Sequence, residues 1–279
     1  MDDTIDEFVF RKPLFGKDVE IVLYDIDEEL ALEAAEKAYA EGVRLSRIFN
    51  FYDDKSELSL LNKERSRQMP DEFMRLLDIA KEFYILTDGR YDVTLGKIFQ
   101  QRKKGLRETA GCSFKDIKIE GNTVTLNHDD VLIDMGSIAK GFIVERMVEV
   151  LEDEGVVSGL VDGRGDLRIF GENTQDIGIQ HPRKKDEMIA KIIVSDCAIA
   201  TSGDYNQFIG SFDNPHIINS LNYASITVVG DDLAIADAFA TAFYVSNNPE
   251  ILERYKNLKV MTIDKDMNIK YYNGFEELL

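Results

Sequence analysis

The 279-residue sequence predicts an α+β fold. Short β-type segments dominate the middle and the C-terminal part of the chain, and helices interrupt them without the regular alternation of a doubly wound sheet. Hydrophobic residues make up 44% of the chain, which is enough for a substantial core, and no proline-rich or serine-rich linker marks a boundary. The expected organisation is a single domain over residues 1–279.

The N-terminal part is predicted to hold one strand and two long helices. Residues 19–24 form an extended stretch, and apolar residues then recur at helical spacing over residues 27–49, with Asp27 placed as the N-cap. A polar interval follows, and Pro70 begins a second amphipathic helix that ends near Gly89.

The remainder of the chain alternates short strands with two further helices. Helices are expected over about 137–154, ending at Gly155, and over about 233–246, ending before Pro249. Residues 259–263 and 268–272 are expected to form a final hairpin. The other predicted strands cover residues 123–126, 131–134, 159–162, 167–170, 189–194, 198–201 and 225–229.

The charge and the cysteine content exclude several classes of protein. With 33 basic and 52 acidic side chains the net charge is −19, which disfavours unaided binding to nucleic acid or to an anionic membrane. The sequence has no long apolar run, so no membrane insertion is expected, and its two cysteines give no disulfide framework. Because the acidic N-terminus lacks the features of a secretory signal, the expected location is the cytoplasm.

The segment VLIDMGSIAKGF, residues 131–142, has the pattern of an anion-binding site. A buried-type strand leads through Gly136 and Ser137 into a helix that carries Lys140. The unsatisfied amides at a helix N-terminus carry partial positive charge, and small residues let a phosphate approach them. The structural alternative is that Ser137 is only an N-cap and that Gly136 and Gly141 are packing residues.

The segment IADAFATAFYV, residues 235–245, could hold a hard cation. Asp237 and Thr241 are four residues apart and so share one face of a helix. Magnesium needs only a few protein oxygens when phosphate and water supply the others. Alternatively, Asp237 is an acid favoured by the helix dipole and Thr241 bonds back to a backbone carbonyl.

Two further segments carry groups that could serve a phosphate ligand. His216, in PHIINS, could be a general base, although a histidine beside two isoleucines is more often structural. In GRYDVTLG, Tyr91 could stack on a ring and Asp92 could accept a hydrogen bond, although both also suit an ordinary strand entry.

Taken in order, these strings resemble the FAD:protein FMN transferases, the ApbE family. Any single match is weak, but seven matches in the family's order are not expected by chance. The seven strings, spread over most of the chain, are DDKSELSLLN, GRYDVTLG, IDMGSIAKGF, GRGDLRIFG, ATSGDY, HIINS and IADAFATAFYV.

The resemblance implies a magnesium-dependent enzyme that binds FAD, joins its FMN moiety to a threonine or serine hydroxyl of an acceptor protein and releases AMP. It also implies two intertwined α/β halves around mixed sheets, with the nucleotide between them. His216 matches the position expected to activate the acceptor hydroxyl. The flavin-nucleotide contacts match Tyr91, Asp92, Asp134, Lys140 and Ile218, and the metal positions match Ser137, Asp237, Ala240 and Thr241.

Two other functions fit the same strings. Water in place of the acceptor would make the protein an FAD pyrophosphatase that releases FMN and AMP. A catalytically idle FAD-binding protein is the second alternative, because the segment after His216 has Asn219, Ser220 and Tyr223 where the family pattern has aspartate, proline and glycine.

Overall fold

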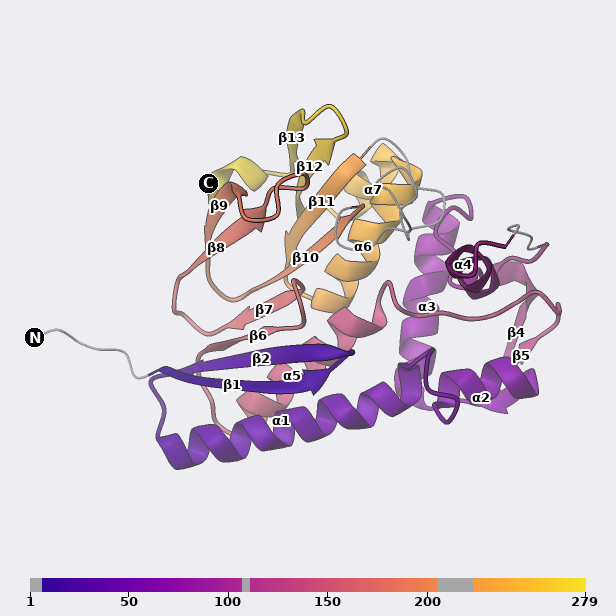
Figure 1. Ribbon diagram of the computed structural model, residues 1–279, viewed down its shortest axis with the longest axis horizontal. Coiled ribbons are helices and arrows are strands. Elements are labelled where there is room, and N and C mark those ends of the chain that lie inside the picture. The colour runs from indigo at the N-terminus through magenta and orange to yellow at the C-terminus, as the bar shows by residue number, and fades with distance from the viewer. Residues whose placement is uncertain (1–6, 107–110, 205–222) are drawn as a thin grey trace, which may run out of the picture.

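The computed structural model describes residues 7–106, 111–204 and 223–279 (Figure 1). Its centre is an eight-stranded antiparallel sheet with the strand order β1-β2-β6-β7-β10-β11-β12-β13. These strands are β1 (Glu7–Leu14), β2 (Lys17–Tyr24), β6 (Gly159–Asp162), β7 (Leu167–Phe170), β10 (Cys197–Gly203), β11 (Tyr223–Gly230), β12 (Lys259–Asp264) and β13 (Ile269–Tyr272).

Three helices cover one face of this sheet. They are α1 (Glu28–Phe49), α5 (Ala139–Asp153) and α6 (Leu233–Ser246). Helix α5 lies between the other two and contacts both, and α6 also packs on β10 and β11. The core beneath them is apolar because side chains alternate along each strand: Ile21 and Leu23 face the helices, whereas Val22 faces the opposite side.

A smaller hydrophobic cluster lies on that opposite side of the sheet. The hairpin of β8 (Gln175–Gln180) and β9 (Met188–Val194) contributes Ile179 and Ile192 to it, and the C-terminal 3-10 helix, Phe275–Leu278, contributes Phe275. Both faces of the central strands are therefore covered, which explains why strands such as β11 are almost continuously buried.

A separate group of elements lies beyond the end of α1 and joins the same helical core (Figure 1). It is formed by residues between α1 and α5, so the chain leaves the large sheet and later returns to it. The group contains α2 (Glu57–Glu64), β3 (Ser66–Gln68), α3 (Asp71–Leu86), α4 (Gly96–Lys103), a 3-10 turn (Phe114–Asp116), β4 (Ile117–Glu120) and β5 (Thr123–Leu126). Strands β3, β5 and β4 form a three-stranded sheet.

The predicted α+β class is confirmed, and so are the long helices, with Asp27 as the N-cap of α1. The predicted strand at residues 131–134 is wrong: this segment forms only an isolated bridge between Leu132 and Leu95. Strand β1 was not predicted, because Pro13 lies in it; at the edge of a sheet that proline is tolerated.

The strand pairing corrects one detail of the expectation of mixed sheets. Every pair of named strands that the structure describes is antiparallel, and the bridge of Leu95 and Leu132 is parallel. The reason is visible at β11 and β12. The chain leaves β11 at Gly230, passes through α6 and α7 (Pro249–Arg254), and re-enters the sheet with Lys259 opposite Val229, at the end where it left.

Candidate functional site

The candidate site is built around the crossing of α5 and α6. Gly141, in the first turn of α5, donates its backbone amide to Oδ2 of Asp237 on α6 at 3.1 Å. A Cβ atom at Gly141 would lie 2.4 Å from the carbonyl oxygen of Leu233, so only glycine permits this approach of the two helices. Gly141 therefore has the predicted packing role, and the same close packing brings its amide to Asp237.

Asp237 is a buried carboxylate beside a partly buried lysine. Its side chain is 6% exposed, and burial raises its pKa, while the positive charge of Lys140 and the amide of Gly141 oppose that rise. Burial lowers the pKa of Lys140, and the charge of Asp237 counteracts this. The carboxylate thus lies at the N-terminal turn of a fifteen-residue helix, where the helix dipole and a lysine both favour negative charge.

Lys140 also forms an ion pair with Asp166, which is almost completely buried. Asp166 follows the turn between β6 and β7, and its backbone carbonyl accepts a hydrogen bond from Gly163 at 2.8 Å. The turn therefore brings a second carboxylate to Lys140. The sequence contained this residue in the string GRGDLRIFG, but no spacing rule connects it with Lys140.

Tyr91 and Ser137 are joined by a hydrogen bond between their hydroxyl groups at 2.9 Å. The N-cap of α5 is Ile138, so the alternative interpretation of Ser137 as an N-cap is wrong. Burial raises the pKa of Tyr91, and the negative charges of Asp237 and Asp134 add to the rise. Tyr91 is consequently a neutral hydroxyl within electrostatic reach of these two carboxylates.

Thr241 lies one turn beyond Asp237 on α6, as its spacing predicts. Its hydroxyl is 3.0 Å from the hydroxyl of Ser202 on β10, so the helix is linked here to the sheet. Ala240, between them, is completely buried, and only its backbone oxygen could serve a ligand. Ser202, from the string ATSGDY, is a further residue that the sequence did not single out.

Asp92 and Asp134 mainly organise the backbone around the site. Asp92 accepts hydrogen bonds from the amide and the hydroxyl of Thr94 at 2.9 and 2.6 Å, and from the amide of Phe114 at 3.1 Å. Asp134 accepts one from the amide of Gly136 at 2.9 Å. Burial raises the pKa of Asp92, and the bonds from Thr94 and Phe114 oppose this.

The loop that contains Asp134 and Ser137 is fixed by residues that sequence reasoning missed. The side-chain amide of Asn62 makes two hydrogen bonds of 2.8 Å with the backbone of Ile133, one to its carbonyl and one from its amide. Arg65 donates to the carbonyl of Val131 at 2.7 Å. Asn62 ends the string DDKSELSLLN, so the resemblance included it without indicating what it contacts.

The predicted residues thus fall into three groups. Tyr91, Ser137, Lys140 and Asp237 gather at the start of α5, with Asp134 nearby, and Thr241 lies one turn along α6. Asp92 contacts the neighbouring Phe114 segment instead. His216 and Ile218 lie outside the described residues.

The oxygen donors fit a hard divalent cation. Within the described part of the chain, Oδ1 of Asp237 accepts no hydrogen bond, while Oδ2 is taken by Gly141. The hydroxyls of Thr241 and Ser137 add neutral oxygens of the kind that magnesium accepts. No cluster of three or more His, Cys, Asp or Glu suited to a metal is found among the described residues, so a cation would need ligand or water oxygens to complete its shell.

No helix within the described ranges is both long and apolar enough to cross a membrane.

Comparison with known proteins gives relatives over about four fifths of the chain. "FAD:protein FMN transferase" of Vibrio cholerae is 27% identical over 259 residues, covering 81% of this chain and 76% of the relative. The protein of the same name from Haemophilus influenzae is 27% identical over 263 residues, covering 80% of this chain and 75% of that protein.

Solved structures share the fold. The ApbE protein of Thermotoga maritima superposes with a TM-score of 0.86 at 24% identity, covering 98% of this chain and 99% of that one. The flavin transferase ApbE of Vibrio cholerae has a TM-score of 0.81 at 22% identity, covering 99% of this chain and 100% of that one. The profile of the ApbE family matches residues 15–263, and the chain belongs to the ApbE family.

Proposed function

We propose that this protein transfers the FMN moiety of FAD to a threonine or serine hydroxyl of an acceptor protein, with Mg²⁺ as cofactor and AMP as the leaving group. Family membership and the printed activity of the relatives support the transferase class. The observation that carries the proposal is the buried carboxylate of Asp237, placed against the N-terminal turn of α5 beside Lys140 and one turn before Thr241.

The proposed reaction is a displacement at the FMN-side phosphorus of the pyrophosphate. The acceptor oxygen forms a new bond to that phosphorus, and the bond from the phosphorus to the bridging oxygen breaks. The bridging oxygen leaves with AMP and retains the electron pair. We assign the proton of the acceptor hydroxyl to His216, the residue whose position matches this role in the family pattern.

Residues of this protein would hold both Mg²⁺ and FAD. Asp237, Thr241, Ser137 and the carbonyl of Ala240 are the proposed protein ligands of Mg²⁺, which when bound would neutralise charge on the pyrophosphate oxygens. Lys140 and the positive end of the α5 dipole would offset charge on the same oxygens. The proposed contacts of the flavin nucleotide are Tyr91, Asp92, Asp134 and Ile218. We further propose that residues 1–279 form one domain and that the protein is located in the cytoplasm.

The test separates transfer from hydrolysis. The purified protein is incubated with FAD and Mg²⁺, with and without protein extract as a source of acceptors, and AMP and free FMN are quantified by chromatography. Transfer predicts AMP in excess of free FMN, fluorescent protein bands under denaturing conditions, and FMN linked to threonine or serine by mass spectrometry. Equal AMP and FMN in both samples would identify a pyrophosphatase instead, and tight FAD binding without AMP would identify an idle flavin-binding protein.

A further inference from the structure

A second contact between α5 and α6 mirrors the one at Asp237. The backbone amide of Leu233, the first residue of α6, donates to Oε2 of Glu145 on α5 at 2.8 Å. Glu145 is four residues after Gly141 on α5, and Leu233 is four residues before Asp237 on α6. Each helix therefore donates one backbone hydrogen bond to a carboxylate of the other helix. The two hydrogen bonds lie about one helical turn apart.

The two contacts are linked by the close approach of Gly141 to Leu233. The carbonyl of Leu233 is the atom that a Cβ at Gly141 would meet at 2.4 Å. A shift of α6 along α5 would break both contacts and would drive backbone atoms together. The pair of contacts therefore fixes where Asp237 lies along α5, and with it the distance from Asp237 to Lys140.

Glu145 is itself held by a largely buried cation from the sheet. Nε of Arg168, on β7, donates to Oε1 of Glu145 at 3.0 Å, and the two side chains are only 12% and 15% exposed. Burial raises the pKa of Glu145, which the bond from Leu233 and the charge of Arg168 oppose. Arg168 also contacts Asp196, whose side chain is 65% exposed. Asp166, two residues before Arg168, pairs with Lys140, so this part of the sheet contacts α5 at both Lys140 and Glu145.

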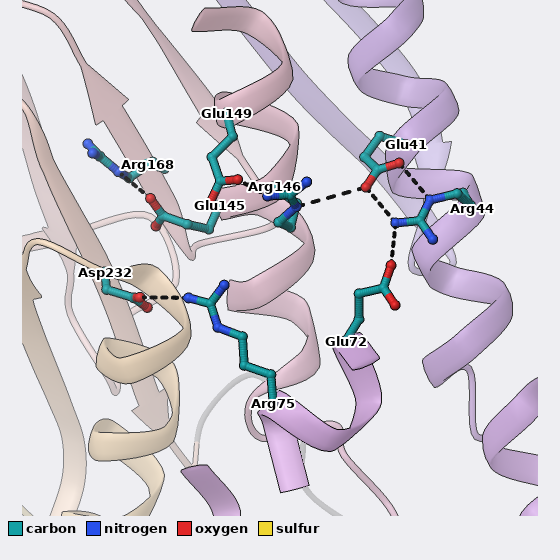
Figure 2. A network of polar contacts seen from close by, with 9 residues as sticks. All are labelled: Glu41, Arg44, Glu72, Arg75, Glu145, Arg146, Glu149, Arg168 and Asp232. Atoms are coloured by element: carbon teal, nitrogen blue, oxygen red, sulfur yellow. Dashed lines mark hydrogen bonds and ion pairs between the residues drawn. The ribbon is translucent and has the colours of Figure 1, made fainter. Parts of the chain in front are cut away.

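The other ion pairs around this point involve arginines that are more exposed than Arg168. Figure 2 shows Glu145 and Arg168 beside two separate groups of contacts: one joins Asp232 to Arg75, and the other links Glu149, Arg146, Glu41, Arg44 and Glu72. Arg75 and Arg44 are each about half exposed, and Arg146 pairs with Glu149 on the same helix. Exposed pairs of this kind contribute little, so the buried pair is the part of the network that can set helix position.

We propose that Glu145 and Arg168 are positioning residues for the reaction: they fix the axial position of α6 on α5 and so place Asp237 beside Lys140 and Gly141, with Thr241 one turn further along α6. The inference rests on the proposed function for its chemical meaning, but the geometric part stands on the contacts alone. Neither residue touches the substrate, and both act through Asp237.

The decisive readout is the exchange rate of the Gly141 amide hydrogen, which reports directly on its bond to Asp237. Glu145→Ala leaves the largely buried Arg168 with the exposed Asp196 as its remaining acidic partner and so risks destabilising the fold. The key variant is therefore Glu145→Ala with Arg168→Met, which removes both charges. We expect Gly141 exchange to rise about tenfold in this double variant, with a smaller rise at amides in the second half of α5. Glu145→Gln keeps a side-chain oxygen that can accept the hydrogen bond from the Leu233 amide. The exchange rate of the Gly141 amide in this variant should therefore stay close to the wild-type rate.

Glu149→Gln is the matched control, because Glu149 lies one turn further along the same helix and is 38% exposed. The activity arm measures the Mg²⁺ concentration that half-saturates AMP release, which should rise about tenfold in the double variant and stay unchanged in the control. Unchanged Gly141 exchange in the double variant, or an equal rise in Glu149→Gln, would overturn the inference. Absence of AMP release from the wild-type protein would overturn the proposed function, while the exchange arm would still decide the positioning role.

Discussion

Tyr91 and Ser137 show how far single residues could be understood from the sequence. Both were singled out, yet their mutual hydrogen bond was not, because 46 residues separate them and no local rule relates them. The contacts of Asn62 with Ile133 and of Lys140 with Asp166 likewise join residues that are far apart in the sequence. Residue types and their positions in motifs were predictable, whereas partners that only the fold brings together were not.

Tyr91→Phe removes the hydroxyl that bonds to Ser137 and keeps the buried ring. We expect the free energy of unfolding to fall by about 1 kcal/mol, the usual value of one hydrogen bond, and the half-saturating Mg²⁺ concentration to rise several-fold. Denaturant titration and AMP release measure the two effects. Tyr39→Phe is the control, because the Tyr39 hydroxyl bonds to the carbonyls of Phe10 and Val19 away from the site. Equal effects of both variants on Mg²⁺ saturation would contradict the assignment of Ser137.

The two cysteines should differ in reactivity. Burial raises the pKa of Cys197 to about 11, and Cys197 lies in the smaller hydrophobic cluster. A raised thiol pKa lowers the thiolate fraction, which at pH 8 is then about one in a thousand. Burial also raises the pKa of Cys112, but its side chain is more accessible. Iodoacetamide at pH 8 should therefore modify Cys112 before Cys197 in the folded protein, as measured by mass spectrometry. In urea, where the protein is unfolded, both cysteines should react at similar rates. Earlier modification of Cys197 in the folded protein would contradict this burial.

At the scale of elements, periodic apolar segments were predicted well and polar ones were not. Helix α6 spans the predicted residues 233–246, because its apolar pattern is continuous and Pro249 follows it. Helix α2 was missed: it lies in the polar stretch after α1, and its N-cap Ser56 is completely buried, which the sequence does not indicate. The segment 131–134 was predicted as a strand because it is apolar, but it is held by Asn62 and Arg65 side chains instead of by a neighbouring strand.

Gly141→Ala tests the helix crossing. Its Cβ would collide with backbone atoms of Leu233, so the two helices must separate, at an expected cost of about 1–3 kcal/mol and with weaker Mg²⁺ saturation of AMP release. Gly42→Ala on α1 is a matched control: there the Cβ meets side-chain atoms of Leu14 and Met147 at 2.8 and 2.9 Å, which can move more easily. Calorimetry and AMP assays on both variants provide the comparison. A Gly141→Ala protein with wild-type Mg²⁺ saturation would contradict the close approach.

At the scale of the whole molecule, the net charge of −19 opposes the binding of an anionic dinucleotide. Around the site, the carboxylates of Asp134, Asp166 and Asp237 outnumber the nearby cations Lys140 and Arg164. Without a divalent cation, FAD should therefore bind more tightly as ionic strength rises from about 10 to about 150 mM, because salt screens the repulsion. Flavin fluorescence can follow this titration, since the chain has no tryptophan. Weaker binding at higher salt would show that local cations dominate instead.

The most direct test of the central claim is AMP release from FAD, measured with Mg²⁺ and with EDTA, for the wild-type protein and for Asp237→Ala. If Asp237 holds the cation that assists cleavage of the pyrophosphate, the wild-type protein releases AMP only with Mg²⁺, and the variant loses about a hundredfold or more in rate while remaining folded. AMP release that persists in EDTA, or that survives in a folded Asp237→Ala protein, would contradict the account.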